Sequence, residues 1–335
     1  MVMPPTLHQH LIKPKALPVG GTIGIVSPAA PTPDVLHFDQ GEALLHQAGY
    51  QTKRFSNAAN KRHYLAGTDQ ERHDDLLAAF LDPNIDAILC ARGGYGTTRI
   101  LSKELLQAAQ KHPKIVIGFS DITALHVALY ERTGLCGFYG PMLTSNLIEE
   151  DTYTWDNLFS IITPNKTDAA SPSTSYPHLV PNQDADTYQC ITSGTASGKV
   201  TAPLYIGNLT LLAALCGTPY QPNPAGHILC IEDWKESHYS LDRQFQQLRM
   251  AGIFDQIKGL LFCDFSQTAL EANQTLTELF DEQFGQLPIP VGYGFSVGHG
   301  KHTATLPYGT VSEFNAKTGQ LMLLESPVIS PQDKT

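Results

Sequence analysis

Short apolar stretches of strand length alternate with amphipathic stretches of helical length through the first half of the chain. The strand-like stretches read TIGIV, IDAILC and KIVIGFS, and residues 35–49, 69–82 and 97–110 have helical periodicity. Successive strand, helix and strand segments form parallel strands joined by right-handed crossovers. The alternation therefore predicts an α/β fold with a doubly wound parallel sheet in the N-terminal half.

The length of the chain and one polar stretch predict two domains. Single hydrophobic cores stop growing near ~250–300 residues, and this chain has 335 residues, 42% of them hydrophobic. The segment 165–191 is rich in Pro, Ser, Asn and Asp and has no apolar periodicity, which is typical of a linker. We expect an N-terminal α/β domain at 1–164, a linker at 165–191 and a C-terminal mixed α/β domain at 192–330.

Three expected strands end in unusual sequence, namely SPAAP, ARGGYG and GFSD. Functional groups of doubly wound folds lie at these carboxyl ends. Ser120 in GFSD has two interpretations. It either caps the following helix, which its residue type favours, or is a nucleophile on a sharp strand-to-helix elbow.

The glycines of ARGGYG, with Gly93 and Gly94 at its centre, also have two interpretations. Backbone N–H groups at such a turn can bind a phosphate, or they can stabilise the oxyanion of a tetrahedral intermediate. The stretch lacks both the Lys-Ser/Thr ending of a P-loop and the GxGxxG spacing, so the phosphate signal is weak.

A serine nucleophile needs a histidine base and a carboxylate that orients it. His299 and His302 lie on the Gly-rich stretch SVGHGKHTATLPYG, where a plain surface loop is the alternative interpretation. Glu232 and Asp233 end the apolar stretch HILCIED, and strand periodicity places them on opposite faces. Periodicity does not say which of the two faces the first domain, and a solvated strand end is the other possibility.

Composition restricts the partners and the compartment. The net charge of −10 and the absence of basic runs argue against nucleic acid and membrane partners and favour small molecules or peptides. The first residues lack the apolar stretch of a signal peptide, and no stretch has the length of a membrane span. Six scattered cysteines indicate free thiols in a reducing cytoplasm, and no Cys/His spacing indicates a metal or other cofactor.

Eight stretches between about residues 20 and 325 together resemble the LD-carboxypeptidase family of serine peptidases, which also contains microcin-immunity peptidases. They are GTIGIVSPAAP, ILCARGGYGTTRIL, VIGFSDITALHVAL, GFYGPM, GNLTLLAALCGTPY, ILCIEDW, DRQFQQLRMAGIFDQIKGLLF and GHGKHTATLPYG. They occur in the family's order, which makes the resemblance far more specific than any single stretch.

The resemblance implies a catalytic triad of Ser120, Glu232 and His299 in a cleft between the two domains. It also implies an oxyanion hole of backbone N–H groups, which would belong to Asp121 and the Gly93–Gly94 turn. Arg92 is the candidate for binding the terminal carboxylate of a peptide, since such binding uses charge-assisted hydrogen bonds.

The implied activity is removal of the terminal D-alanine from murein tetrapeptides during cytoplasmic peptidoglycan recycling, and a homodimer is expected. Two alternatives stay open: an immunity peptidase that hydrolyses a peptidyl-nucleotide toxin, and a binding module without catalysis. The proline-containing N-terminal extension and the long linker depart from the family's usual pattern.

Overall fold

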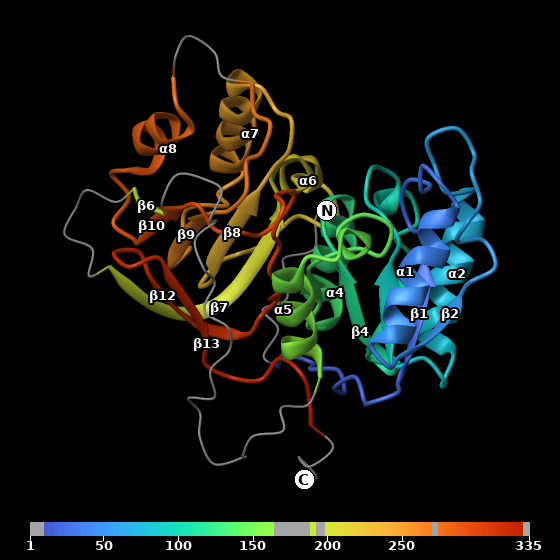
Figure 1. The fold of residues 1–335 in the computed structure, drawn as a ribbon. Helices are drawn as coiled ribbons and strands as arrows, with labels where there is room; N and C mark the ends of the chain where they lie inside the picture. Colours follow the sequence, from blue (N-terminus) through green and yellow to red (C-terminus); the bar gives the residue numbers. More distant parts are fainter. Residues whose placement is uncertain (1–9, 164–187, 192–197, 270–273, 331–335) are drawn as a thin grey trace.

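The computed structural model describes residues 10–163, 188–191, 198–269 and 274–330. The chain forms two lobes, each built around one β-sheet with helices packed on it (Figure 1). The first sheet belongs almost entirely to the N-terminal half, and the second to the C-terminal half. The predicted α/β class with two sheets is therefore confirmed.

The first sheet has the strand order β11-β5-β4-β3-β1-β2. Its strands are β1 (Thr22–Val26), β2 (Gln51–Arg54), β3 (Ala87–Cys90), β4 (Ile115–Gly118), β5 (Phe138–Tyr139) and β11 (Leu306–Pro307). All pairs are parallel except β11 with β5. The central strands are buried on both faces because helices cover both sides, as in other parallel sheets.

Helices from the first half lie on the two faces of this sheet, which confirms the doubly wound prediction. One face packs against α1 (Leu36–Gln47) and α5 (Thr152–Ile162). The other packs against α2 (Asp69–Leu81), α3 (Lys103–Lys111) and α4 (Thr123–Thr133). Three short 3₁₀ turns complete the half: Thr97–Arg99, Ser120–Ile122 and Leu147–Glu149.

Two details of the first half differ from the sequence prediction. Strand β2 is the polar segment QTKR at the sheet edge, and its exposed side chains give no apolar signal. Residues 97–110 were expected to form one helix, but a 3₁₀ turn and α3 share this range. The break falls at Ser102, whose hydroxyl caps α3 by accepting the N–H of Leu105.

The second sheet has the order β13-β12-β7-β8-β9-β10-β6, with a parallel centre and antiparallel outer strands. Its strands are β6 (Gln189–Cys190), β7 (Lys199–Asn208), β8 (Ile228–Glu232), β9 (Gly259–Phe262), β10 (Val291–Tyr293), β12 (Val311–Asn315) and β13 (Gln320–Leu323). Its helices are α6 (Leu209–Leu215), α7 (His238–Met250) and α8 (Leu276–Phe284).

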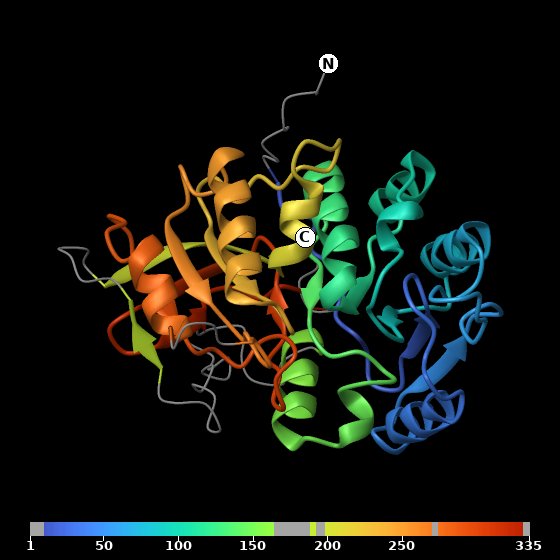
Figure 2. The ribbon, with the colours of Figure 1, turned by 90° about the horizontal axis from the view of Figure 1, so that it is seen from above.

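Helix α4 lies between the two lobes and beside α6 (Figure 2). Burial of α4 is not limited to one face, because almost every residue of this helix is buried. Its outer side packs against α6 and β7 of the second lobe, which a helical wheel does not reveal. His126 is fully buried, with Nε2 2.8 Å from the Gly118 carbonyl oxygen.

Most of the predicted linker, residues 165–187, lies outside the described residues, while Gln189 and Cys190 at its end form β6. All six cysteines are free thiols, four of them buried, as expected. Within the ranges given above, none of the helices combines the length and apolar character that a membrane crossing requires.

Candidate active site

Ser120 lies at the carboxyl end of β4 with a left-handed backbone, φ 62°. Positive φ is uncommon for a residue with a side chain, and such strain concentrates at functional sites. The Ser120 side chain makes no capping hydrogen bond to the 3₁₀ turn that it begins or to α4. The helix-cap interpretation is therefore wrong, and the geometry is that of a sharp strand-to-helix elbow.

The other two expected loops lie beside this elbow because β1, β3 and β4 are adjacent parallel strands. The N–H of Ala30 donates to the Gly93 carbonyl oxygen at 3.1 Å, which joins SPAAP to ARGGYG. A Cβ atom on Gly93 would lie 2.9 Å from Cβ and 3.1 Å from Oγ of Ser120. Gly94 has φ +105°, and a Cβ there would lie 2.5 Å from Cβ of Ala30. Gly93 is thus required by its close packing against Ser120, and Gly94 by its positive φ and its close packing against Ala30.

Asp121 and Arg92 each make a contact that the sequence did not predict. Oδ2 of the buried Asp121 carboxylate accepts the N–H of Thr97 at 2.8 Å, which ties the end of the glycine loop to the elbow. Burial raises the pKa of Asp121 above its ordinary value. The Arg92 guanidinium donates from Nη1 to the Pro31 carbonyl oxygen at 3.0 Å.

The second lobe contributes a carboxylate and a histidine that contact each other. Oε2 of Glu232, at the end of β8, lies 2.6 Å from Nδ1 of His299, on the loop after β10. Glu232 is fully buried, and 16% of the His299 side chain is exposed. A carboxylate only accepts hydrogen bonds, so Nδ1 carries the proton and Nε2 is left as the basic nitrogen.

The His299 ring lies between the two lobes. It packs edge-on against Phe119, the neighbour of Ser120, with centroids 4.8 Å apart. It also stacks on Trp234 with centroids 5.4 Å apart and an interplanar angle of 6°. These two rings hold the imidazole beside the elbow of the first lobe.

Three buried carboxylates control the charge of His299. Burial alone would lower the pKa of His299, but the charges of Glu232, Asp233 and Asp264 outweigh it and leave that pKa above its ordinary value. Burial, followed by the charge of Glu232, raises the pKa of Asp233 and of Asp264 to about 6 each. These charges therefore stabilise the imidazolium, which is the form that His299 takes when it accepts a proton.

Sequence reasoning missed two partners of Glu232. Tyr139, at the end of β5, donates its hydroxyl hydrogen to Oε1 at 2.7 Å. Asn208, at the end of β7 and in register with Glu232, donates from Nδ2 to the same oxygen at 3.1 Å. Both residues lie in stretches that carried the family resemblance, but their roles depend on strand register and on the second lobe.

Asp233 and His302 have main partners of their own, although Asp233 also accepts from Nδ2 of Asn208 at 3.0 Å. Asp233 is buried, and its carboxylate accepts the Thr210 N–H at 3.0 Å in the first turn of α6. Asp233 therefore caps α6, which precedes it in the chain, and not α7, which follows it. Its carboxylate is not solvated. Nδ1 of His302 lies 2.8 Å from Oδ1 of Asp151, which caps α5.

Comparisons with known proteins identify the family of this chain. Family models described as the LD-carboxypeptidase N-terminal and C-terminal domains match residues 23–140 and 201–314. A Bacillus subtilis protein named "Probable murein peptide carboxypeptidase" is 35% identical over 311 residues, which cover 90% of this chain and 91% of that protein. This chain belongs to the LD-carboxypeptidase family.

Two further comparisons place the chain within the LD-carboxypeptidase family. The murein tetrapeptide carboxypeptidase of Pseudomonas aeruginosa is 31% identical over 301 residues, which cover 87% of this chain and 92% of that protein. The solved structure of MccF in complex with glutamyl sulfamoyl guanosine has a TM-score of 0.82 at 25% identity, covering 95% of this chain and 99% of that one. The two-lobed fold is thus shared across the family.

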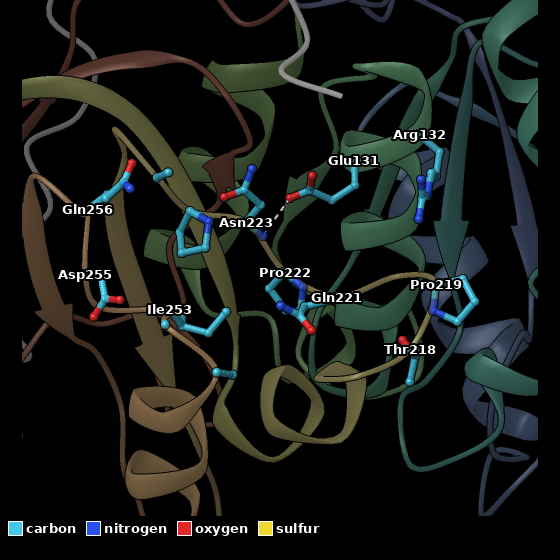
Figure 3. Close-up of a pocket in the computed structure, with 14 residues that line it drawn as sticks. Glu131, Arg132, Thr218, Pro219, Gln221, Pro222, Asn223, Ile253, Asp255 and Gln256 are labelled. Carbon is cyan, nitrogen blue, oxygen red and sulfur yellow. Dashed lines mark hydrogen bonds between the residues drawn. The ribbon is translucent and has the colours of Figure 1, made fainter. Parts of the chain in front are cut away.

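A separate pocket of about 200 Å³ lies near the other end of α4 (Figure 3). Roughly 12 Å of helix separates Glu131, which lines it, from the start of α4 beside Ser120. The Glu131 carboxylate accepts the Asn223 N–H at 3.0 Å and the Tyr205 hydroxyl at 2.9 Å. Both partners belong to the second lobe, so this pocket lies where the lobes meet and is distinct from the candidate active site.

Proposed function

We propose that this protein is a serine LD-carboxypeptidase that releases the terminal D-alanine of murein tetrapeptides. The observation that carries the proposal is the 2.6 Å contact between Glu232 and His299, beside the strained Ser120 elbow. The names of the Bacillus and Pseudomonas relatives point to the same class of substrate. The proposal includes the division into domains 1–164 and 192–330 with a linker at 165–191.

In the proposed reaction, Nε2 of His299 takes the Ser120 hydroxyl proton while Oγ attacks the carbonyl carbon of the bond to D-alanine. Glu232 stabilises the imidazolium that forms. The carbon–nitrogen bond then breaks, and the imidazolium gives its proton to the departing amine. Water hydrolyses the resulting ester, with His299 again acting as the base, and releases the tripeptide.

The first lobe supplies the remaining groups of this proposal. Backbone N–H groups of Gly93, Gly94 and Asp121 stabilise the oxyanion of the tetrahedral intermediate. Arg92 binds the terminal carboxylate of the peptide, exchanging its hydrogen bond with Pro31 for a charge-assisted one.

Incubation of the protein with a murein tetrapeptide, followed by assay of free D-alanine, tests the proposal. We expect turnover by the wild-type protein and a loss of several orders of magnitude in kcat for Ser120→Ala, with the thermal unfolding temperature nearly unchanged. Turnover should survive EDTA. Binding of the tetrapeptide without release of D-alanine would instead indicate the non-catalytic binding module.

One observation favours a second candidate, hydrolysis of a peptidyl-nucleotide by the same three residues. Trp234, which stacks on His299, is a 40% exposed residue with the Lys235 ammonium 4.1 Å from its ring centroid, and the MccF structure holds a nucleoside-containing compound. An exposed aromatic side chain is the kind of group on which a nucleotide base packs. Parallel measurements of kcat/KM on a murein tetrapeptide and on an aminoacyl sulfamoyl nucleoside distinguish the two substrates.

A cytoplasmic location and a homodimer remain part of the proposal. Sedimentation equilibrium of the purified protein tests the second point, and a monomer at micromolar concentration would contradict it.

A further inference from the structure

We propose that Tyr139 is a positioning residue for the reaction, because its hydroxyl joins the backbone of Ser120 to the carboxylate of Glu232. This inference rests on the proposed function and adds a fourth side chain to it. Tyr139 touches neither substrate nor reacting atoms in the scheme above, so its effect passes through the two residues that it contacts.

The hydrogen bonds of Tyr139 have only one possible direction. The backbone N–H of Ser120 can only donate, so the phenol oxygen accepts it, at 3.2 Å. The phenol hydrogen then donates to Oε1 of Glu232 at 2.7 Å. The Thr123 hydroxyl, 3.5 Å away, donates to the second lone pair. A phenol has one hydrogen and two lone pairs, and all three are used.

Burial and charge keep this hydroxyl protonated. Tyr139 is fully buried, and burial first, followed by the charge of Glu232, raises the pKa of Tyr139 well above its ordinary value. The group therefore donates to Glu232 throughout the working pH range. A donor to a buried carboxylate stabilises its charge and weakens its attraction for the proton on the neighbouring imidazole.

The contact with Ser120 fixes the elbow and restricts the oxyanion hole. It holds a residue with φ 62° in a conformation that an L-amino acid rarely adopts. It also directs the Ser120 N–H toward Tyr139 and the interior. The oxyanion hole must therefore use other N–H groups, which agrees with the proposed Gly93, Gly94 and Asp121.

The contact with Glu232 fixes which oxygen faces the histidine. Tyr139 and Asn208 both donate to Oε1, whereas His299 contacts Oε2. Because Tyr139 comes from the first lobe and Glu232 from the second, this hydroxyl also sets the position of the carboxylate relative to the elbow.

The test compares Tyr139→Phe with Tyr308→Phe as a matched control. Tyr308 is also fully buried between the lobes, but its hydroxyl donates to the Ile206 carbonyl oxygen and not to Ser120 or Glu232. We expect Tyr139→Phe to lower kcat for D-alanine release about 10–100-fold, as for loss of a hydrogen bond to a charged group. KM should change little, and Tyr308→Phe should keep the wild-type rate.

The pH profile distinguishes positioning from general stability. Without the phenol donor, Glu232 holds the imidazolium more strongly, so the acid limb of kcat/KM should move to higher pH in Tyr139→Phe and stay in place in Tyr308→Phe. The same upward shift should appear in an NMR titration of His299 made in the Ser120→Ala background, which needs no turnover. An unchanged titration would overturn the inference even if the proposed reaction stands.

A second probe applies if Tyr139→Phe does not fold. Incorporation of 3-fluorotyrosine at position 139 keeps the shape of the ring and makes the hydroxyl a stronger donor, so the acid limb and the His299 titration should both move to lower pH. No shift, or a shift upward, overturns the inference. Full activity of Ser120→Ala would instead refute the proposed function itself, whatever the Tyr139 variants do.

Discussion

Oε2 of Glu232 lies 2.6 Å from Nδ1 of His299, although 67 residues separate them. Because the surrounding carboxylates outweigh burial and raise the pKa of His299, neutral imidazole forms only above the ordinary value of 6.5. We therefore expect the acid limb of kcat/KM to lie above that pH. Glu232→Gln should move the limb to lower pH and cost roughly 10²–10⁴-fold in rate.

A pH-rate profile of the wild-type protein and of Glu232→Gln measures both effects. A limb at the same pH in both proteins would mean that the carboxylate does not control the base.

Gly93→Ala should lower activity with little effect on folding. The new methyl group would lie 2.9 Å from Cβ and 3.1 Å from Oγ of Ser120, so the serine must move from its place on the elbow. A displacement of a reacting group by about 1 Å costs roughly 10²-fold in rate. Gly49→Ala is the control. The new Cβ atom would meet open space, so the rate should not change, but the positive φ of +92° should lower the free energy of unfolding by about 1 kcal/mol. Assays of kcat and thermal unfolding on both variants test this, and equal rates would contradict it.

Asp233→Ala should damage stability more than chemistry. The substitution removes the acceptor of the half-buried Thr210 N–H and one of the two acceptors of Asn208 Nδ2, which still donates to Glu232. An unsatisfied donor inside a protein costs about 1–3 kcal/mol, so we expect a loss of about 1–2 kcal/mol in urea unfolding. The rate should fall far less than in Glu232→Gln. The opposite ranking of the two rates would exchange the roles of the two acids.

The two histidines of the Gly-rich loop should behave differently. His299→Ala should abolish turnover because it removes the proposed base. His302 contacts Asp151, the cap of α5, so His302→Ala should keep measurable turnover and change mainly KM and the stability of that helix end. Steady-state kinetics on both variants decide this, and an inactive, folded His302→Ala protein would refute the assignment.

Glu131, near the pocket of Figure 3, should make stability depend on pH. Burial raises its pKa from 4.5 to about 7, so the folded state keeps the proton to higher pH than the unfolded state does. Wild-type stability should therefore fall as pH rises from about 4.5 through 7. Glu131→Gln removes the ionisable group. The free energy of unfolding of this variant minus that of the wild-type protein should therefore rise by about 2–3 kcal/mol between pH 5 and pH 8. A difference that stays constant across this range would contradict the prediction.

The sequence predicted those features that depend on local pattern. Alternating strands and helices predicted the first sheet. Glu232 and Asp233 both accept from Nδ2 of Asn208, and their placement on opposite faces stays a prediction. The local pattern left the role of Ser120 open, and it was the resemblance of many stretches that favoured the elbow. Features that depend on distant contacts were missed. Tyr139 gains its partners only through the pairing of β5 with β4 and the approach of the second lobe, and α4 is buried by elements far along the chain.

Strand β11 has a consequence for the order in which the molecule can be assembled. Its residue Leu306 pairs with Tyr139, although five of the seven strands of the second sheet precede β11 in the chain. On the ribosome, the edge of the first sheet that carries Tyr139 therefore stays uncovered until most of the C-terminal half has been synthesised. Completion of the first sheet therefore comes after Ser120, Glu232 and His299 have all been synthesised.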